Sequence, residues 1–345
     1  MKTAAVAFAA FALAAPVLTP PPAHAQAAPA SACAPVGDLH FICGLVNVED
    51  FLPVDGGKYL VGGSFKDASA GMYLIDTASK TARTVDLTIA AKPDPIYADC
   101  PGAPDLHKLS THGTDVRAGK DGTTTVFMVN HGGRESVEVF RLTAARNAAE
   151  WIGCVVMPEG TSANSLVGLP DRSIVVTKLY DTRTRGAGIS PVLQGQITGL
   201  VYHWVPGKGI SVVPGSELSG DNGLVASLDG KTLFINAYGT KEVWRVPLSG
   251  QGERTSAKVD FNPDNLRWAP DGTIFVTGQY LSPGKLQGPN DWGVARLDPK
   301  TMKVAMVVKE PGTKEFDDGT TAVQVGGTLF FGTFRGDRVA WRAAP

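Results

Sequence analysis

The chain has 345 residues, of which 43% are hydrophobic and 19% are charged, so it is long enough for one large domain with a sizeable core. Its formal net charge of -1 at pH 7 excludes the strongly basic composition of proteins that bind nucleic acid or anionic membrane surfaces. The 40 glycines and 24 prolines are many for a helical protein and ordinary for one that is rich in tight turns.

Residues 1–25 are expected to form a signal peptide that is cleaved. Lys2 provides a positive charge, residues 4–17 are almost wholly apolar, and Ala23-His24-Ala25 fits a cleavage site made of small residues. A membrane anchor is the alternative, but the apolar run is short and prolines interrupt it. No other segment approaches the roughly 20 apolar residues that a spanning helix needs. We therefore expect a secreted or periplasmic protein.

Export bears on the four cysteines, because an even number of cysteines in an oxidising compartment indicates disulfides. Cys33, Cys43, Cys100 and Cys154 allow three connectivities, and the sequence does not choose among them. We favour Cys33–Cys43 with Cys100–Cys154, which would hold down an N-terminal arm and brace one structural repeat. A zinc site is the alternative, but no CxxC pair supports it.

Six times along the chain, a tight turn opens into a short run of residues that favour β-strands. In chain order the turns and runs are Asp55-Gly56-Gly57 before 58–61, Asp121-Gly122 before 125–129, Pro170-Asp171 before 173–176, Asp229-Gly230 before 232–235, Pro270-Asp271-Gly272 before 273–276, and Gly326-Gly327 before 328–331. Residues 137–142 and 242–246 alternate with period two, which indicates antiparallel strands. Residues 144–149 could form at most a short helical turn, and no helical run is long enough for a βαβ unit.

A strand–turn–strand repeat with about 50 residues per unit is typical of a β-propeller. We predict an all-β fold, a six-bladed β-propeller at residues 41–345 with an N-terminal arm at residues 26–40. Its blades are expected to have four antiparallel strands each and to surround a central channel. A β-sandwich is the alternative, but it does not explain why a polar residue precedes each turn at a similar distance.

These polar residues are Glu49, His112, Asn164, Asn222, Asp264-Asn265 and Thr320-Thr321. In a propeller the innermost strand of each blade lies beside the channel, so residues near its start can point into the channel mouth. We call the acidic and amide members the oxygen ring: Glu49, Asn164, Asn222, Asp264 and Asn265. Two carboxylates and three amides without cysteine favour calcium over zinc or copper. The alternative is that Asn and Asp beside glycine only form turns, as Asn222-Gly223 would by itself.

Two histidines are candidates for catalysis. His112 stands at the polar position of the second repeat and His131 at the far end of the same hairpin, so the two strands can bring the imidazoles together. A histidine above a calcium site can act as general base on water, because its pKa lies near neutrality. For His40, His107 and His203 we adopt the alternative, a core or surface position.

A series of short motifs runs through residues 45–342: Glu49-Asp50-Phe51-Leu52-Pro53, His112-Gly113, Val129-Asn130-His131, residues 136–140, Asn164, Asn222-Gly223-Leu224, Asp264-Asn265 and Gly332-Thr333-Phe334. In this order they resemble the paraoxonase family of calcium-dependent lactonases and arylesterases, six-bladed propellers related to gluconolactonase-like and strictosidine-synthase-like proteins. By that resemblance, the oxygen ring matches the ligands of a catalytic calcium, and His112 and His131 match a histidine dyad. Asp50, with the carbonyl of Thr114, matches a ligand of a second, structural calcium.

The sequence departs from this family in two places. The family has Asp directly after the Asn of the third blade, where this chain has Ser165. The loss of one carboxylate is expected to weaken or abolish a second calcium site. The family's disulfide between the two ends of the chain also has no cysteine near residue 340 to form it.

The resemblance implies a hydrolase of lactones or aryl esters, in which calcium polarises the carbonyl while His112, relayed through His131, activates water. One alternative is a gluconolactonase-like hydrolase of sugar lactones or phosphotriesters, which the histidine pair disfavours. Another is a binding propeller in which calcium only holds the fold together. The loops at residues 180–195 and 280–292 are expected to select the substrate.

Overall fold

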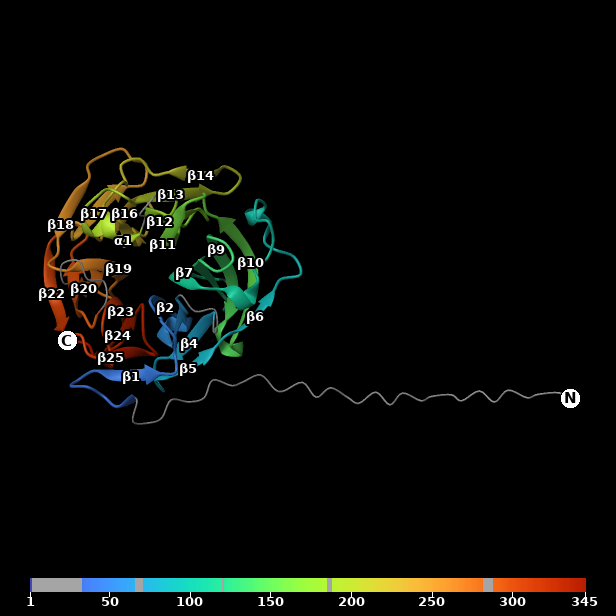
Figure 1. Cartoon of the computed structure of the whole chain (residues 1–345), viewed down its shortest axis with the longest axis horizontal. Coiled ribbons are helices and arrows are strands. Elements are labelled where there is room, and N and C mark those ends of the chain that lie inside the picture. The colour runs from blue at the N-terminus through green and yellow to red at the C-terminus, as the bar shows by residue number, and fades with distance from the viewer. Residues whose placement is uncertain (2–32, 66–70, 120, 185–187, 282–287) are drawn as a thin grey trace.

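The computed structural model describes residues 1, 33–65, 71–119, 121–184, 188–281 and 288–345. Within them there are six small sheets, which stand in a ring around a central axis, as Figure 1 shows. Five sheets have four strands and one has five, and the predicted six-bladed β-propeller is confirmed. The expected signal peptide and the first part of the arm fall on residues 2–32 and, apart from Met1, lie outside the described residues.

Each blade runs from a strand at the channel to a strand at the rim. The first contains β2 (Phe51–Val54), β3 (Tyr59–Gly63), β4 (Met72–Asp76) and β5 (Thr81–Thr84); the second β7 (Thr111–Ala118), β8 (Thr124–Asn130), β9 (Ser136–Thr143), β10 (Ala148–Val156) and β6 (Asp86–Ile89); and the third β11 (Thr161–Gly168), β12 (Ile174–Asp181), β13 (Leu200–Val205) and β14 (Gly209–Val212). The fourth contains β15 (Asp221–Ala226), β16 (Thr232–Ala237), β17 (Glu242–Pro247) and β18 (Thr255–Lys258); the fifth β19 (Asn262–Trp268), β20 (Ile274–Tyr280), β21 (Asp291–Leu297) and β22 (Val304–Glu310); and the sixth β23 (Gly319–Val325), β24 (Thr328–Thr333), β25 (Arg338–Ala343) and β1 (His40–Cys43).

Helical structure is sparse in the described part of the chain. It comprises α1 (Ile189–Leu193) and the 3₁₀ turns η2 (Asp55–Gly57), η3 (Pro95–Tyr97), η4 (Leu106–Lys108) and η5 (Ala144–Arg146). None of these described helices has the length and apolar character needed to cross a membrane.

The six turns predicted from the sequence join the innermost strand of each blade to its second strand. In four of them an Asp carboxylate accepts the backbone N–H two residues ahead, at 3.0 to 3.3 Å; these are Asp121, Asp171, Asp229 and Asp271. The glycine that follows three of these residues has a φ of 72° to 81°, a conformation that glycine adopts without steric cost. The Asp-Gly pairs thus define the hairpin beside the channel.

The two ends of the chain close the ring. β1 pairs antiparallel with β25, with His40 opposite Trp341 and Cys43 opposite Arg338. Figure 1 shows blue β1 beside red β25 at the rim of the sixth blade. The imidazole of His40 also stacks on the Trp341 ring, with 4.5 Å between the centroids. Backbone pairing therefore joins the two ends of the described chain without a disulfide between them.

Both disulfides have the favoured connectivity. Cys33–Cys43 joins the arm to the end of β1, and Cys100–Cys154 joins the segment after β6 to strand β10. β6 adds a fifth strand to the second blade by pairing parallel with β10, an addition that the prediction of four-stranded blades did not include. A strand and a covalent bond thus fasten the long connection between the first two blades to the rim.

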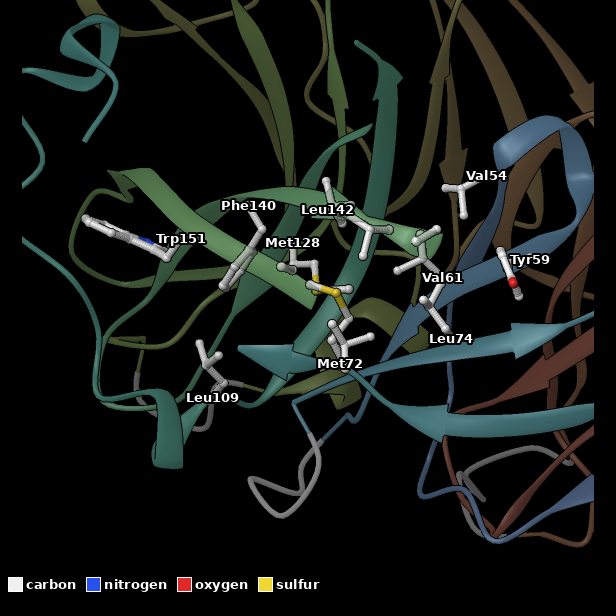
Figure 2. Close-up of a cluster of buried hydrophobic side chains, with 14 of the residues drawn as sticks. Val54, Tyr59, Val61, Met72, Leu74, Leu109, Met128, Phe140, Leu142 and Trp151 are labelled. Atoms are coloured by element: carbon white, nitrogen blue, oxygen red, sulfur yellow. The ribbon is translucent and has the colours of Figure 1, made fainter. Parts of the chain in front are cut away.

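The hydrophobic core lies between neighbouring blades. Figure 2 shows the cluster between the first and second blades, where Met72 and Leu74 from β4 meet Met128 from β8 and Phe140 from β9. All four side chains are fully buried. One such cluster fills each of the six interfaces between blades. Because burial of apolar surface holds the blades to one another, the channel itself is left for polar side chains.

The two disulfides are expected to contribute unequally to stability. The variant C100A/C154A opens a loop of 54 residues, and C33A/C43A opens a loop of 10. Chain entropy of the unfolded state predicts losses of about 4 and about 3 kcal/mol respectively. Thermal unfolding of the two variants measures the difference, and each is the other's control. A larger fall in melting temperature for C33A/C43A contradicts the expectation.

Candidate active site and metal centre

A pocket of about 570 Å³ opens where the innermost strands begin; we call it the site pocket. Four members of the oxygen ring line it, namely Glu49, Asn164, Asn222 and Asp264, and so do both candidate histidines. The fifth member, Asn265, is buried and donates a hydrogen bond from its amide nitrogen to Glu49 Oε1. The structure therefore brings together all five ring residues, which come from four blades.

Backbone irregularities direct these side chains. In β7, β11, β15 and β19 the register with the second strand is interrupted, and the skipped pairs are His112-Gly113, Asn164-Ser165, Asn222-Gly223 and Asp264-Asn265. A bulge takes a residue out of the alternating pattern of the strand and re-aims its side chain. The same irregularity in four blades thus presents polar pairs at one end of the channel.

Neighbouring bulges pack so closely that two positions require glycine. A Cβ atom at Gly113 would lie 2.2 Å from the carbonyl oxygen of Asn164, and one at Gly223 would lie 2.3 Å from that of Asp264. Asn222-Gly223 therefore does not form a turn. It belongs to strand β15, and its glycine lets the fourth blade approach the fifth.

Several oxygens of the ring accept no hydrogen bond from the described part of the chain. Glu49 Oε2, Asn164 Oδ1, Asn222 Oδ1 and Asn265 Oδ1 are all buried in this state. An unsatisfied buried acceptor costs about 1–3 kcal/mol, and a cation held by these four oxygens would remove that cost. Carboxylate and amide oxygens are the ligands that calcium prefers, and the residues present fit this ion.

Burial opposes ionisation of the ring carboxylates when no cation is bound. Desolvation raises the pKa of Glu49 well above its usual value, and the negative charges of Asp264 and Asp50 raise it further. Desolvation also raises the pKa of Asp264 to about 7. A divalent cation reverses this balance because it stabilises the carboxylate forms. Cation binding at the ring should therefore release protons and become tighter as the pH rises.

Further polar side chains hold the ring in place. Gln279 donates from Nε2 to Asp264 Oδ2 at 2.7 Å, and the Tyr238 hydroxyl donates to Gln279 Oε1 at 2.8 Å. Burial raises the pKa of Tyr238 well above its usual value, so the hydroxyl remains a donor. Thr320 donates to the backbone oxygen of Glu49 at 2.6 Å. Gln279 thus fixes the Asp264 carboxylate from outside the ring, and Thr320 fixes the backbone of Glu49.

The two candidate histidines are linked in a chain that ends at a carboxylate. His112 Nδ1 lies 3.0 Å from His131 Nε2, and His131 Nδ1 lies 2.9 Å from Glu135 Oε2. Because a carboxylate accepts, His131 carries its proton on Nδ1 and accepts at Nε2 from His112 Nδ1–H. His112 Nε2 is then the basic nitrogen, 3.6 Å from Glu49 Oε2. Phe65 stacks on the His112 ring, with centroids 4.1 Å apart, and fixes its plane.

Sequence reasoning missed Glu135, Gln279 and Tyr238. Glu135 also accepts the backbone N–H of Ala163 at 2.6 Å, so the third blade holds the carboxylate of the second in place. The spacing of four residues from His131 to Glu135 was the one available signal. Gln279 and Tyr238 lie on or beside second strands, where the repeat carried no marker.

Asp50, the proposed ligand of a second calcium, is not among the residues that line the site pocket. It forms an ion pair with Arg267, and both side chains are buried. Ser165, at the position of the family's missing carboxylate, accepts the N–H of Leu224 at 3.3 Å. Sequence reasoning did not identify Arg267.

The sequence profile of the arylesterase family matches residues 58–291, more than half of the chain. The chain belongs to the arylesterase family. The match includes both histidines and every member of the oxygen ring except Glu49. No curated protein sequence matches the chain significantly.

Solved structures share the fold of this arylesterase-family protein at low sequence identity. A luciferin-regenerating enzyme has a TM-score of 0.59 and 14% identity, covering 90% of this chain and 96% of its own. A gluconolactonase-type protein has a TM-score of 0.52 and 16% identity, and the alignment covers 91% of this chain and 94% of that protein. A glucose dehydrogenase-type oxidoreductase from Thermus thermophilus has a TM-score of 0.52 and 14% identity, and the alignment covers 88% of this chain and 98% of that protein. At these identities the likeness is one of fold alone.

The ring amides are expected to be required for calcium binding. Asn164→Ala and Asn222→Ala each remove one oxygen ligand, and each should weaken calcium affinity about tenfold or more. Isothermal titration calorimetry on protein stripped with a chelator measures this. Asn130→Ala is the control, because its amide oxygen accepts the N–H of Ser110 outside the ring. Wild-type affinity in both ring variants would rule out the assignment.

Proposed function

We propose that this protein is an exported, calcium-dependent hydrolase of lactones or aryl esters. The observation that carries the proposal is the combination of buried, donor-free oxygens with a histidine–histidine–glutamate chain at one pocket. Membership in the arylesterase family supports hydrolysis of ester bonds as the reaction type.

Glu49, Asn164, Asn222, Asp264 and Asn265 would hold the calcium ion. When bound, the ion would polarise the substrate carbonyl and stabilise the negative charge that develops on its oxygen. The ring residues themselves contribute fixed positions, since Gln279 and Thr320 hold the two acidic ones from outside. Little reorganisation is then needed when the substrate arrives.

His112 would take the proton from the attacking water at Nε2. The positive charge that this creates is shared along the chain, because His112 Nδ1–H donates to His131 and His131 Nδ1–H donates to Glu135. Glu135 thus sets the tautomer of both imidazoles and stabilises the protonated pair. This is the function of a carboxylate behind a catalytic histidine in general.

The walls of the site pocket would favour flat or apolar substrates. Phe65, Tyr180, Ile189, Tyr238 and Phe334 line it around the ring and the histidines. Tyr180 and Ile189 lie in the first of the two loops expected to select the substrate. Residues 282–287 of the second loop lie outside the described residues.

Export is supported by the two disulfides, which persist in oxidising compartments. The sequence of residues 1–25, with its apolar run and small-residue cleavage site, agrees with this. We therefore place the mature protein in the periplasm or outside the cell.

The purified mature protein is expected to hydrolyse phenyl acetate or members of a panel of γ- and δ-lactones. Chelation should abolish turnover, and calcium should restore it, because four buried ring oxygens accept no hydrogen bond from the described part of the chain and the mechanism needs the ion that they would hold. Including sugar lactones and a phosphotriester in the panel tests the gluconolactonase-like alternative. Turnover that survives complete chelation would contradict the proposed mechanism, and turnover of none of these compounds would favour a binding protein.

The two ends of the histidine chain are expected to affect catalysis more than substrate binding. His112→Gln removes the base and should lower kcat about 10²-fold. Glu135→Gln removes the negative charge behind His131, and because the Ala163 N–H takes the amide oxygen, the NH2 group faces His131 Nδ1 and disfavours the proton there; kcat should fall about tenfold. KM and calcium affinity should change little in either variant. His107→Gln, an exposed histidine in η4, is the control, and a wild-type kcat in His112→Gln would remove this histidine from the mechanism.

A further inference from the structure

Arg267 lies in the channel below the oxygen ring. On β19 it follows the ring pair Asp264-Asn265 by two positions, and its side chain is 5% exposed. It also lines a second pocket, of about 340 Å³, at the ends of the innermost strands. The guanidinium therefore stands between the site pocket and the opposite mouth of the channel.

Oxygens from three blades surround this guanidinium. Nη2 forms an ion pair with Asp50 Oδ2 next to the first blade and donates to the Thr114 carbonyl of the second blade at 3.0 Å. Nη1 donates to the Leu266 carbonyl of the fifth blade at 2.7 Å. The Thr114 N–H also donates to Asp50 Oδ2 at 2.7 Å. The Asp50 carboxylate and the carbonyls of Thr114 and Leu266 thus all contact the positively charged guanidinium of Arg267.

The remaining atoms do not fit a second calcium. Calcium takes about six to eight oxygen ligands. Asp50 Oδ1 is buried and accepts no hydrogen bond from the described part of the chain. Asp50 Oδ2 and the carbonyl oxygen of Thr114, however, already accept hydrogen bonds from Arg267. The third blade offers Ser165, whose hydroxyl already accepts a hydrogen bond and carries no charge.

The charges lead to the same conclusion. Glu49, Asp50 and Asp264 bring three negative charges to the channel interior and Arg267 brings one positive charge, so one divalent cation neutralises the set. A second divalent cation would leave two uncompensated positive charges in a buried place, which is strongly unfavourable. Asp115 is further out, at the opposite mouth, where it is partly exposed and accepts the Gly168 N–H at 2.8 Å.

We propose that the Arg267 guanidinium is a built-in structural cation that takes the place of a second calcium. The chain then binds a single divalent cation, at the oxygen ring, and the first, second and fifth blades remain joined at the channel when that cation is removed. The stoichiometry rests on the proposed calcium site, whereas the role of Arg267 does not.

Two measurements test these statements separately. Calorimetric titration of chelator-stripped wild-type protein should give one calcium per chain, and two would overturn the proposal. No binding would overturn the calcium site of the proposed function, and the second measurement alone would then decide the role of Arg267.

The second measurement is thermal unfolding in the presence of a chelator and of calcium. Loss of one partner of a buried ion pair predicts that Arg267→Met lowers the melting temperature by about 5–10 °C in both conditions. Arg267→Lys keeps the charge, so its melting temperature should fall less than that of Arg267→Met. If the methionine variant does not fold, the lysine variant still tests the proposal. The control is Arg172→Met, because Arg172 forms an exposed pair with Asp94. If Arg267→Lys and Arg267→Met both have the melting temperature of the wild type in the presence of chelator, Arg267 is not a structural cation.

Discussion

The close approach of the innermost strands is the constraint on which the rest of the structure depends. Apolar clusters between the blades press six strands against one channel, and at Gly113 and Gly223 the backbones meet so tightly that no side chain fits. The ladders break at the same level in four of these strands. Close packing between the blades and the bulges in their innermost strands thus together place polar side chains at this mouth of the channel.

Such a channel concentrates carboxylates in a place from which water is largely excluded. Each of Glu49, Asp50 and Asp264 has its pKa raised by burial, so an opposite charge nearby is needed if they are to stay ionised. The protein meets this need in two ways along one axis. At the mouth, the proposed calcium ion would supply this charge, and below the mouth the Arg267 side chain supplies it through its ion pair with Asp50. In this proposal, the mouth of the channel serves catalysis, and the level of Arg267 holds the blades together.

The sequence predicted the fold, and it predicted that the five residues of the oxygen ring lie together, because both follow the repeat. Asn164 and Asn222 are uninformative singly, but they occupy the same place relative to a turn in successive repeats, and the structure brings them to one pocket. Glu135 and Arg267 had no such signal. Glu135 lies in a glycine-rich loop, where an acidic residue is ordinarily solvated. Arg267 meets Asp50 only because ring closure brings the fifth blade near the first at the channel, and no local pattern encodes a contact between such distant segments.

The closure of the sixth blade by β1 and β25 has a consequence for how the chain acquires its shape. The paired segments are about 300 residues apart, so this contact is among the most non-local in the fold and the entropy of loop closure opposes it. The last strand must be synthesised before the first one can find its partner. Until then, the rim of the sixth blade exposes unpaired backbone on both sides of the gap, which is the kind of edge that recruits other chains. During biogenesis this protein is therefore most vulnerable to aggregation at the seam where its two ends meet.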